Sequence, residues 1–296
     1  MAGGLPGSRP LGPGGILYVV ATPIGNLGDV TLRALEVLRA VPLIAAEDTR
    51  ISKRLLARYE IETRAVSFHA RSGPARLEQL LEHLRIGADL ALVTDAGTPV
   101  VSDPGGDLVA GWAGEGGIVV PIPGASAVLA AVAASGIAGP RWSFEGFLPR
   151  SGRERKERLA RIAADDRATV VYEAPTRLAA TLRDLAAACG AERPAAVCRE
   201  MTKLHEQIAR GTLAELSAAV VGGEIPARGE IALVVAGRGG GTSESEEAAG
   251  SVTGMATLAE ARERVSQLAA SGLRRTDAAR QVATETGFSR RDLYEN

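Results

Sequence analysis

Cysteine, histidine and aromatic residues are scarce in this sequence, and each scarcity excludes a class of protein. Two cysteines are too few for a disulfide framework or for a cysteine-rich zinc or iron–sulfur site. Three scattered histidines leave little material for a metal centre, so we expect no bound metal. The formal net charge of −1 excludes a chain coated with basic charge. Any contact with nucleic acid must therefore come from local basic patches.

Segments that would target the chain to a membrane are also missing. The first fifteen residues lack the apolar core of a signal peptide and are expected to form a disordered leader. The longest stretch without charge, 116–140, is interrupted by Pro121, Pro123 and Gly124. That interruption favours a strand, a tight turn and an alanine-rich helix over a membrane span. We therefore expect a soluble, cytoplasmic protein.

The length of 296 residues and the apolar share of 46% indicate about two globular domains. Short β-branched runs alternate with amphipathic helical stretches over 16–138, which predicts a parallel sheet covered by helices on both faces. A second mixed α/β domain is expected over 139–237. The small, polar and acidic segment 238–254 is typical of a flexible linker. Residues 255–296 predict a small helical domain, for which a helix-turn-helix and a capping helical hairpin fit equally well.

Individual elements of the first domain can be predicted from the hydrophobic pattern. The leucine spacing in 30–41 predicts a helix capped by Asp29, and 74–85 predicts a helix that begins with Pro74. The expected strands are 16–22, 43–48, 65–69, 89–97 and 118–124.

Polar loops rich in glycine and proline follow most of the predicted strands. Because ligands of parallel α/β sheets bind beyond the carboxyl ends of the strands, such loops on one sheet edge favour a shared cleft. The loops of the first domain are 22–29, 47–50, 94–105 and 121–126, and the second domain adds 172–177 and 198–206.

The sequences of these loops resemble the successive motifs of one enzyme family. The motifs are ATPIGNLGD, AEDTR, TDAGTPVVSDPG, PIPGASA, YEAPTRL and CREMTKLHEQIARG, which occur in this order within 16–237. Together they resemble the 2′-O-ribose methyltransferases of small-subunit ribosomal RNA, within the tetrapyrrole-methylase-like (class III) methyltransferases. The tail after residue 255 is similar to the small helical domain of that family.

The resemblance implies an enzyme that methylates the 2′-hydroxyl of a cytidine in 16S rRNA with S-adenosylmethionine. It further implies two α/β domains with the cofactor in the cleft between them, the 30S subunit as partner, and a homodimer. A tetrapyrrole methyltransferase acting on a porphyrin-like acid is the first alternative. A non-catalytic RNA-binding assembly factor is the second.

The resemblance also implies which residues contact the cofactor. For Asp95, balancing the sulfonium charge and fixing its own loop are equally good interpretations. The implied cofactor contacts are Pro23, Asp95, Gly97, Thr98, Val101, Ser102, Ser126, Ala127, Tyr172, Glu173 and Gly229.

Catalysis and RNA binding call for charged side chains. A ribose hydroxyl must lose its proton as the methyl group arrives, so a base or a stabilising cation is needed. The candidates are Glu47, Asp48 and Arg50 in one loop, and Glu200, Lys203 and Glu206 in another. A structural ion-pair cluster explains the same residues. The basic run 150–167 suggests phosphate contacts by Arg150, Arg153, Arg155 and Lys156, and the arginine-rich tail from Arg262 is a second basic region.

Overall fold

The computed structural model describes residues 14–239, 258–270, 272–286, 288 and 293. The expected leader lies almost entirely outside these residues, as does most of the expected linker. The chain divides into two compact units, 1–239 and 240–296. Within the described residues, no helix is both long and apolar enough to cross a membrane.

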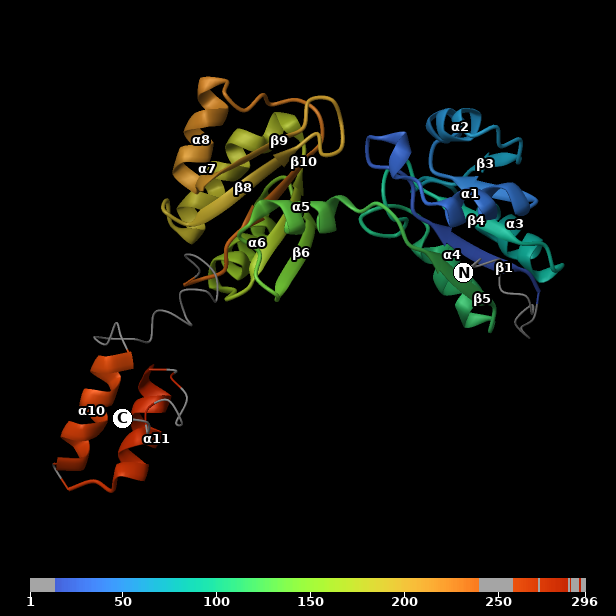
Figure 1. The fold of residues 1–296 in the computed structure, drawn as a ribbon. Helices are drawn as coiled ribbons and strands as arrows, with labels where there is room; N and C mark the ends of the chain where they lie inside the picture. Colours follow the sequence, from blue (N-terminus) through green and yellow to red (C-terminus); the bar gives the residue numbers. More distant parts are fainter. Residues whose placement is uncertain (1–13, 240–257, 271, 287, 289–292, 294–296) are drawn as a thin grey trace. The chain divides into compact units, whose positions relative to one another are not determined.

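The first unit contains two five-stranded sheets, which confirms the predicted α/β class (Figure 1). The strands of the first sheet are all parallel and follow the order β3-β2-β4-β1-β5. Their bounds are β1 Ile16–Val20, β2 Leu43–Ala46, β3 Ala65–Ser67, β4 Leu90–Val93 and β5 Ile118–Ile122. Each of the five falls within a predicted strand.

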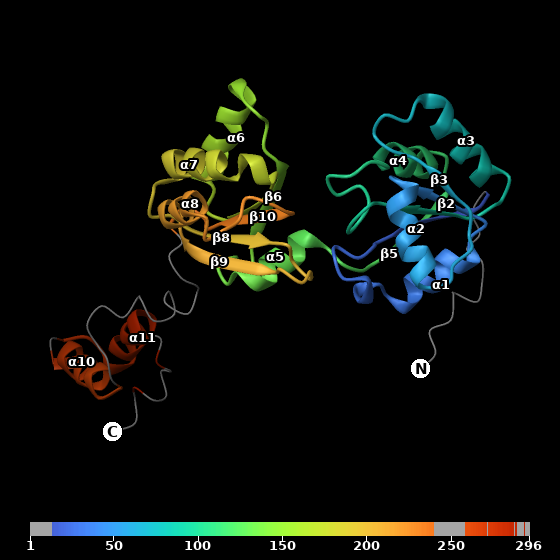
Figure 2. The ribbon, with the colours of Figure 1, turned by 90° about the horizontal axis from the view of Figure 1, so that it is seen from above.

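Helices cover both faces of this sheet, as its nearly continuous apolar strands require (Figure 2). The helices α1 (Leu32–Ala40) and α2 (Thr49–Arg58) pack against one face. The helices α3 (Pro74–Arg85) and α4 (Gly106–Gly114) pack against the other, where Trp112 is buried.

Two helix starts can be compared with their predictions. The cap predicted at Asp29 is wrong, because Asp29 ends a short 3-10 helix, η1 (Leu27–Asp29). The cap is Thr31, whose side chain accepts a hydrogen bond from the backbone N–H of Ala34. Pro74 is at the first position of α3, as predicted.

The second sheet has the order β6-β7-β10-β8-β9 and is mixed. Strand β6 pairs with β7 in parallel, and the other neighbours are antiparallel. The strand bounds are β6 Trp142–Phe147, β7 Ala168–Glu173, β8 Pro194–Arg199, β9 Gln207–Thr212 and β10 Ile231–Val235. The remaining elements of this part are α5 Ala127–Ser135, α6 Gly152–Ala164, η2 Pro175–Arg177, α7 Leu178–Cys189 and α8 Leu213–Gly222.

The alanine-rich helix α5 packs against the second sheet rather than the first. Val128 and Ala131 join the apolar cluster formed by one face of β7, β8 and β10, while α6, α7 and α8 cover the opposite face. The boundary expected after residue 138 keeps α5 with the first sheet. The chain passes from the packing of one sheet to that of the other before Ala127.

The second unit contains helices α10 (Leu258–Ala270) and α11 (Arg275–Thr286). They pack through a small apolar core that includes Ala261, Val265, Ala278 and Val282. This helical pair agrees with the predicted small helical domain.

Candidate functional site

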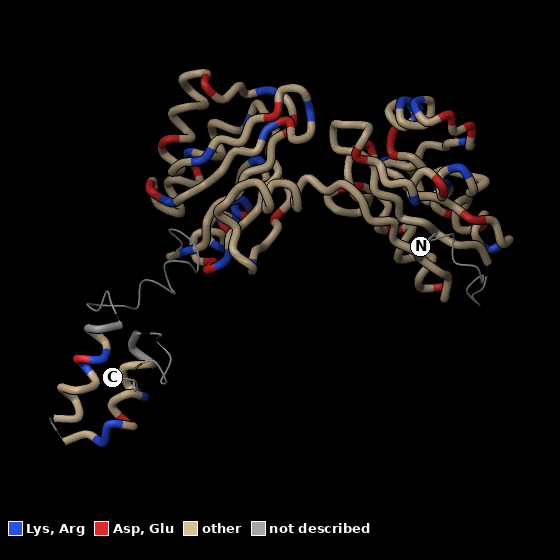
Figure 3. Tube along the Cα trace, in the orientation of Figure 1, with Lys and Arg blue, Asp and Glu red and all other residues tan. Residues whose placement is uncertain are grey.

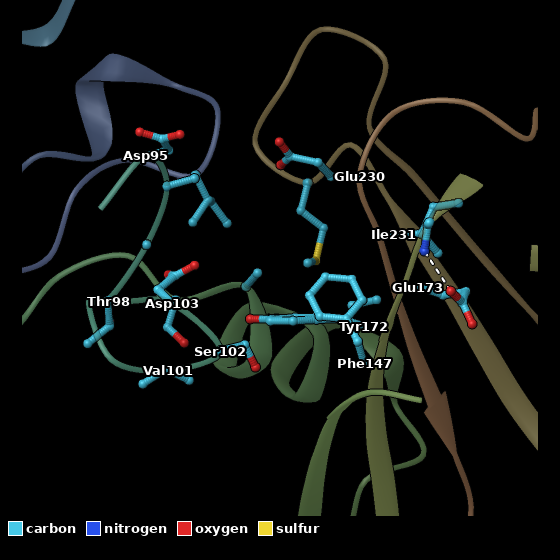
Figure 4. Close-up of a pocket in the computed structure, with 18 of the residues that line it drawn as sticks. Asp95, Thr98, Val101, Ser102, Asp103, Phe147, Tyr172, Glu173, Glu230 and Ile231 are labelled. Carbon is cyan, nitrogen blue, oxygen red and sulfur yellow. Dashed lines mark hydrogen bonds between the residues drawn. The ribbon is translucent and has the colours of Figure 1, made fainter. Parts of the chain in front are cut away.

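A cavity of about 400 Å³ lies where the loops after the first sheet meet residues of the second sheet. Its volume is in the range of small-molecule and cofactor sites. Figure 4 shows side chains from both groups of elements around it. The cavity is lined by Ile24, Glu47, 95–98, 101–103, Ser126, Ala127, Phe147, 172–175, Met201 and 229–232.

All the predicted cofactor residues except Pro23 line this cavity. Pro23 is buried, between Thr22 and the cavity-lining Ile24. The backbone N–H of Thr22 donates to the carbonyl of Gly97 at 2.8 Å, and the N–H of Gly97 donates back at 3.0 Å. Pro23 is therefore next to the pairing that holds one wall of the cavity.

The loop 94–105 has a strained backbone. Gly97 has φ +86°, a conformation that glycine adopts without cost. Val100 and Ser102 have φ of 75° and 66°, which is unfavourable for side chains, above all for a β-branched one. The Thr98 hydroxyl donates to the carbonyl of Ala125 at 3.3 Å and so ties this loop to the one before α5. Strain of this kind persists only where surrounding contacts impose the loop shape.

The loop 200–206 makes up a second strained segment beside the cavity. Glu200 and Thr202 have φ of 50° and 65°. Lys203 Nζ donates to Glu200 Oε1 at 2.8 Å and lies 3.1 Å from Glu230 Oε2. Gly229 has φ +85°, and a Cβ there would lie 2.5 Å from the Glu200 carboxyl carbon. A side chain at this position, which the family resemblance implies as a cofactor contact, would be strained at this φ and would displace the Glu200 carboxylate.

Three carboxylic acids line the first-sheet side of the cavity: Glu47, Asp95 and Asp103. Glu47 Oε2 accepts from the Thr94 hydroxyl at 2.6 Å, and Asp95 Oδ1 accepts from the backbone N–H of Asp48 at 3.0 Å. Burial, and then the charge of Glu47, raise the pKa of Asp95. Burial, together with the nearby charges of Glu47 and Asp95, raises the pKa of Asp103 to about 6. The cavity therefore concentrates negative charge on one side.

The other catalytic candidates lie outside the cavity lining. Asp48 caps α2 and binds Arg50, with 2.6 Å between Asp48 Oδ2 and Arg50 Nη2. These hydrogen bonds lower the pKa of Asp48 to about 2. Glu206 accepts from the backbone N–H of Thr202 at 2.6 Å. Of the predicted catalytic side chains, the structure brings Glu47 to the cavity and places the others in local ion pairs or loop contacts.

Glu173 lines the cavity without directing its carboxylate into it. Its side chain is fully buried and accepts hydrogen bonds from the Thr181 hydroxyl at 2.5 Å and from the backbone N–H of Ala174 at 2.8 Å. Arg177 Nε lies 3.3 Å from the same carboxylate. Glu173 therefore shapes the cavity wall through its backbone, next to Tyr172.

Several lining residues were not predicted, among them Ile24, Asp103, Phe147, Met201 and Glu230. Asp103 lies within the motif TDAGTPVVSDPG, where the alternation of acid and glycine could have identified it. Phe147 and Met201 carry no signal in a single sequence, since an apolar residue beside a strand is usually part of a core.

The predicted RNA-binding residues separate into exposed and buried side chains. Arg150, Arg153 and Lys156 are exposed, and Arg153 pairs with Glu157 on the same helix. Arg155 differs from its prediction, because its side chain is only 9% exposed and its guanidinium binds Asp184, Thr181 and the carbonyl of Pro149. It faces α7 and is engaged in the fold. In the rest of the described chain, acidic and basic residues are interspersed (Figure 3).

Comparison with known proteins places the chain in a family. The profile described as Tetrapyrrole (Corrin/Porphyrin) Methylases matches residues 16–217. The chain is 47% identical to "Ribosomal RNA small subunit methyltransferase I" of Synechocystis sp., over 95% of this chain and 96% of that protein. It is 41% identical to the protein of the same name from Bacillus subtilis, over 95% and 93% of the two chains.

Solved structures agree on the fold. A cobalt precorrin-4 methyltransferase aligns with a TM-score of 0.59 at 20% identity, over 75% of this chain and 94% of that one. Uroporphyrin-III C-methyltransferase from Thermus thermophilus, complexed with S-adenosylhomocysteine, aligns with a TM-score of 0.56 at 19% identity, over 75% and 97%. With its motif loops gathered at one cavity and this similarity along most of its length, the chain belongs to the tetrapyrrole (corrin/porphyrin) methylase family.

Proposed function

We propose that this chain is an S-adenosylmethionine-dependent methyltransferase that methylates the ribose 2′-oxygen of a cytidine in 16S rRNA. The observation that carries the proposal is the similarity at 41–47% identity over 95% of the chain to proteins named as methyltransferases of small-subunit rRNA. The motif loops that suggested the same reaction surround the cavity.

The cavity fits the cofactor in size and in chemistry. When bound, S-adenosylmethionine supplies a methyl group on a positively charged sulfur. Asp95 and Asp103 provide negative charge within the cavity, and Ile24 and Met201 provide apolar surface for the rest of the molecule. The glycine at 97 lets backbone groups of its loop approach a ligand closely. We propose that the predicted residues that line the cavity form this cofactor site, namely Asp95, Gly97, Thr98, Val101, Ser102, Ser126, Ala127, Tyr172, Glu173 and Gly229.

In this proposal, a carboxylate of the cavity accepts the proton of the ribose hydroxyl. Glu47 already accepts the Thr94 hydroxyl hydrogen, and Asp95 accepts an N–H of the following loop. Asp103 has a pKa of about 6, near the pH at which a general base both stays ionised and takes up a proton effectively. Asp103 is therefore the proposed proton acceptor, and the charge of Glu47 contributes to its raised pKa.

In this proposal, exposed cations outside the cavity hold the phosphate backbone of the RNA substrate. Arg150, Arg153 and Lys156 lie at the start of α6 or before it and are proposed to contact phosphates of the rRNA. The ion pair of Lys203 with Glu230 leaves Lys203 as a positioning residue for the cavity rim. Action on the 30S subunit implies a cytoplasmic protein, and we propose a homodimer as its working state, which light scattering of the purified chain tests.

One experiment separates this function from its alternatives. The purified protein is incubated with S-adenosylmethionine and unmodified 30S subunits, and ribose methylation of 16S rRNA is mapped by mass spectrometry. A parallel reaction contains a uroporphyrinogen-type substrate. A single methylated cytidine ribose supports the proposal, whereas methyl transfer only to the tetrapyrrole refutes it. Failure to bind S-adenosylmethionine in calorimetry would instead indicate a non-catalytic RNA-binding factor.

A further inference from the structure

An irregularity in strand β6 brings two aromatic side chains to the same face of the second sheet. Along the β6–β7 ladder Phe144 pairs with Val170, and Phe147 pairs with Tyr172. Three steps along β6 thus match two along β7, which is the pattern of a β-bulge. Without the bulge, residues three apart would point to opposite faces. With it, both rings contact Tyr172.

The geometry of this aromatic group is well defined. The Phe144 and Tyr172 ring centroids are 5.0 Å apart at 72°, and those of Phe147 and Tyr172 are 5.5 Å apart at 57°. These are the edge-on and tilted arrangements that aromatic pairs prefer. Tyr172 thereby buttresses Phe147 from one side and fixes the orientation of its ring.

Gly146 makes this arrangement possible. Its φ is +61°, and a Cβ there would lie 3.0 Å from the hydroxyl oxygen of Ser102. The bulge therefore meets the strained 94–105 loop, in which Val101 also lines the cavity. Phe147 therefore follows a glycine that lies close to this loop, and its ring packs against Tyr172 of the second sheet.

Phe147 remains 53% exposed although it lines the cavity. Among the described residues it is the aromatic member of the exposed large hydrophobic side chains. Figure 4 shows it next to Tyr172, across the cavity from Asp95. A fixed, exposed ring at a cavity mouth offers a flat apolar surface to a planar ligand.

We propose that Phe147 is the platform on which the base of the target nucleotide stacks, and this inference rests on the proposed function. Sequence-specific recognition of RNA mostly targets single-stranded nucleotides, whose unstacked bases commonly stack on aromatic side chains. Every base presents a π-face, so the contact needs no hydrogen-bond donor from the protein. Val101, 38% exposed on the neighbouring loop, supplies a further apolar contact.

The test compares Phe147→Ala, Phe147→Tyr and wild-type enzyme on 30S subunits. Loss of base stacking costs about 5- to 150-fold in kcat/KM for the 30S substrate in F147A. F147Y retains the ring and is expected to retain the activity. Calorimetry with S-adenosylhomocysteine is expected to give the wild-type Kd for both variants. Ile86→Ala, which removes an exposed side chain at the end of α3, is the matched control and should behave as wild type.

A binding measurement gives a second readout that does not depend on turnover. A short single-stranded RNA with a fluorescent cytidine analogue should lose fluorescence on binding wild type and F147Y but not F147A. An equal loss of S-adenosylhomocysteine affinity in F147A would assign the ring to the cofactor and overturn the inference. Unchanged kcat/KM, or a change of oligomeric state in F147A, would also overturn it. Wild type inactive on 30S subunits would refute the proposed function instead.

Discussion

Replacing Arg155 by alanine is expected to damage the fold rather than RNA binding directly. Its Nε and Nη2 donate to Asp184 Oδ2 at 2.9 and 2.7 Å, and Nη1 donates to the carbonyl of Pro149 at 2.8 Å. Nη2 also donates to the Thr181 hydroxyl, which in turn donates to the buried carboxylate of Glu173. The side chain connects α6 to α7 and, through Thr181, to the wall of the cavity.

The expected loss of stability in Arg155→Ala follows from the polar groups that lose their partner. Removing one partner of a buried ion pair costs about 3–5 kcal/mol. Asp184 is 45% exposed and can be hydrated again, so a lower cost of about 2–3 kcal/mol is expected here. For a unit of this size, each kcal/mol lowers Tm by about 2–4 °C, which gives a decrease of about 4–12 °C in Arg155→Ala.

Thermal unfolding followed by circular dichroism measures this decrease. Lys156→Ala is the matched control, because Lys156 is the adjacent residue and exposed, and its stability should change by no more than about 0.5 kcal/mol. A wild-type Tm in Arg155→Ala combined with weaker binding to 30S subunits would refute the reasoning. It would show that the guanidinium acts on RNA and that its buried contacts are dispensable.

The remaining predictions concern the cavity and its surroundings. Asp103→Asn should lower the single-turnover methylation rate by about 10²–10⁴-fold, and a wild-type rate would exclude Asp103 as the base. Since burial raises its pKa from 3.8 to about 6, Asp103 keeps a proton in the folded protein that it loses in the unfolded chain, so its contribution to wild-type stability falls as pH rises from about 4 to 6. The Tm of Asp103→Asn relative to wild type should therefore increase as pH rises through this interval. A Tm difference that does not change with pH would contradict the prediction. Gly229→Ala should weaken S-adenosylhomocysteine binding in calorimetry, because its Cβ collides with Glu200, while Gly190→Ala, at φ +97° in open space, should not. Lys156→Glu should raise KM for 30S subunits at low salt, with no change in cofactor affinity.

Much of the fold is predictable from local pattern. Apolar runs placed all five strands of the first sheet, and Pro74 marked the start of α3 because its missing N–H and fixed φ suit that position. The prediction at Asp29 failed because a 3-10 turn intervenes and Thr31 occupies the capping position. Periodicity also cannot tell which sheet an alanine-rich helix covers. The helix α5 follows a strand of the first sheet in the chain but packs against the second sheet.

The site was predictable where backbone chemistry carried the signal. Loops after parallel strands converge by topology, so the loops that carry Gly97 and Ser126 were expected to meet, and both residues line the cavity. Phe147 was not found, because its direction depends on a bulge that only the β6–β7 register reveals. The burial of Arg155 was equally invisible, since its neighbours Arg153 and Lys156 are exposed and only the approach of α7 distinguishes it.

The net charge of −1 has a physical explanation in the proposed reaction. A sulfonium cofactor and an RNA backbone carry opposite charges, so one protein must keep its two complementary surfaces apart. Carboxylates gather in the cavity at Asp95 and Asp103, where partial burial strengthens their interaction with a cation. Exposed cations such as Arg153 and Lys156 lie in solvent, where they can meet phosphates. In the proposed reaction these carboxylates would face the positively charged sulfur of a bound cofactor, and the exposed cations would face the RNA.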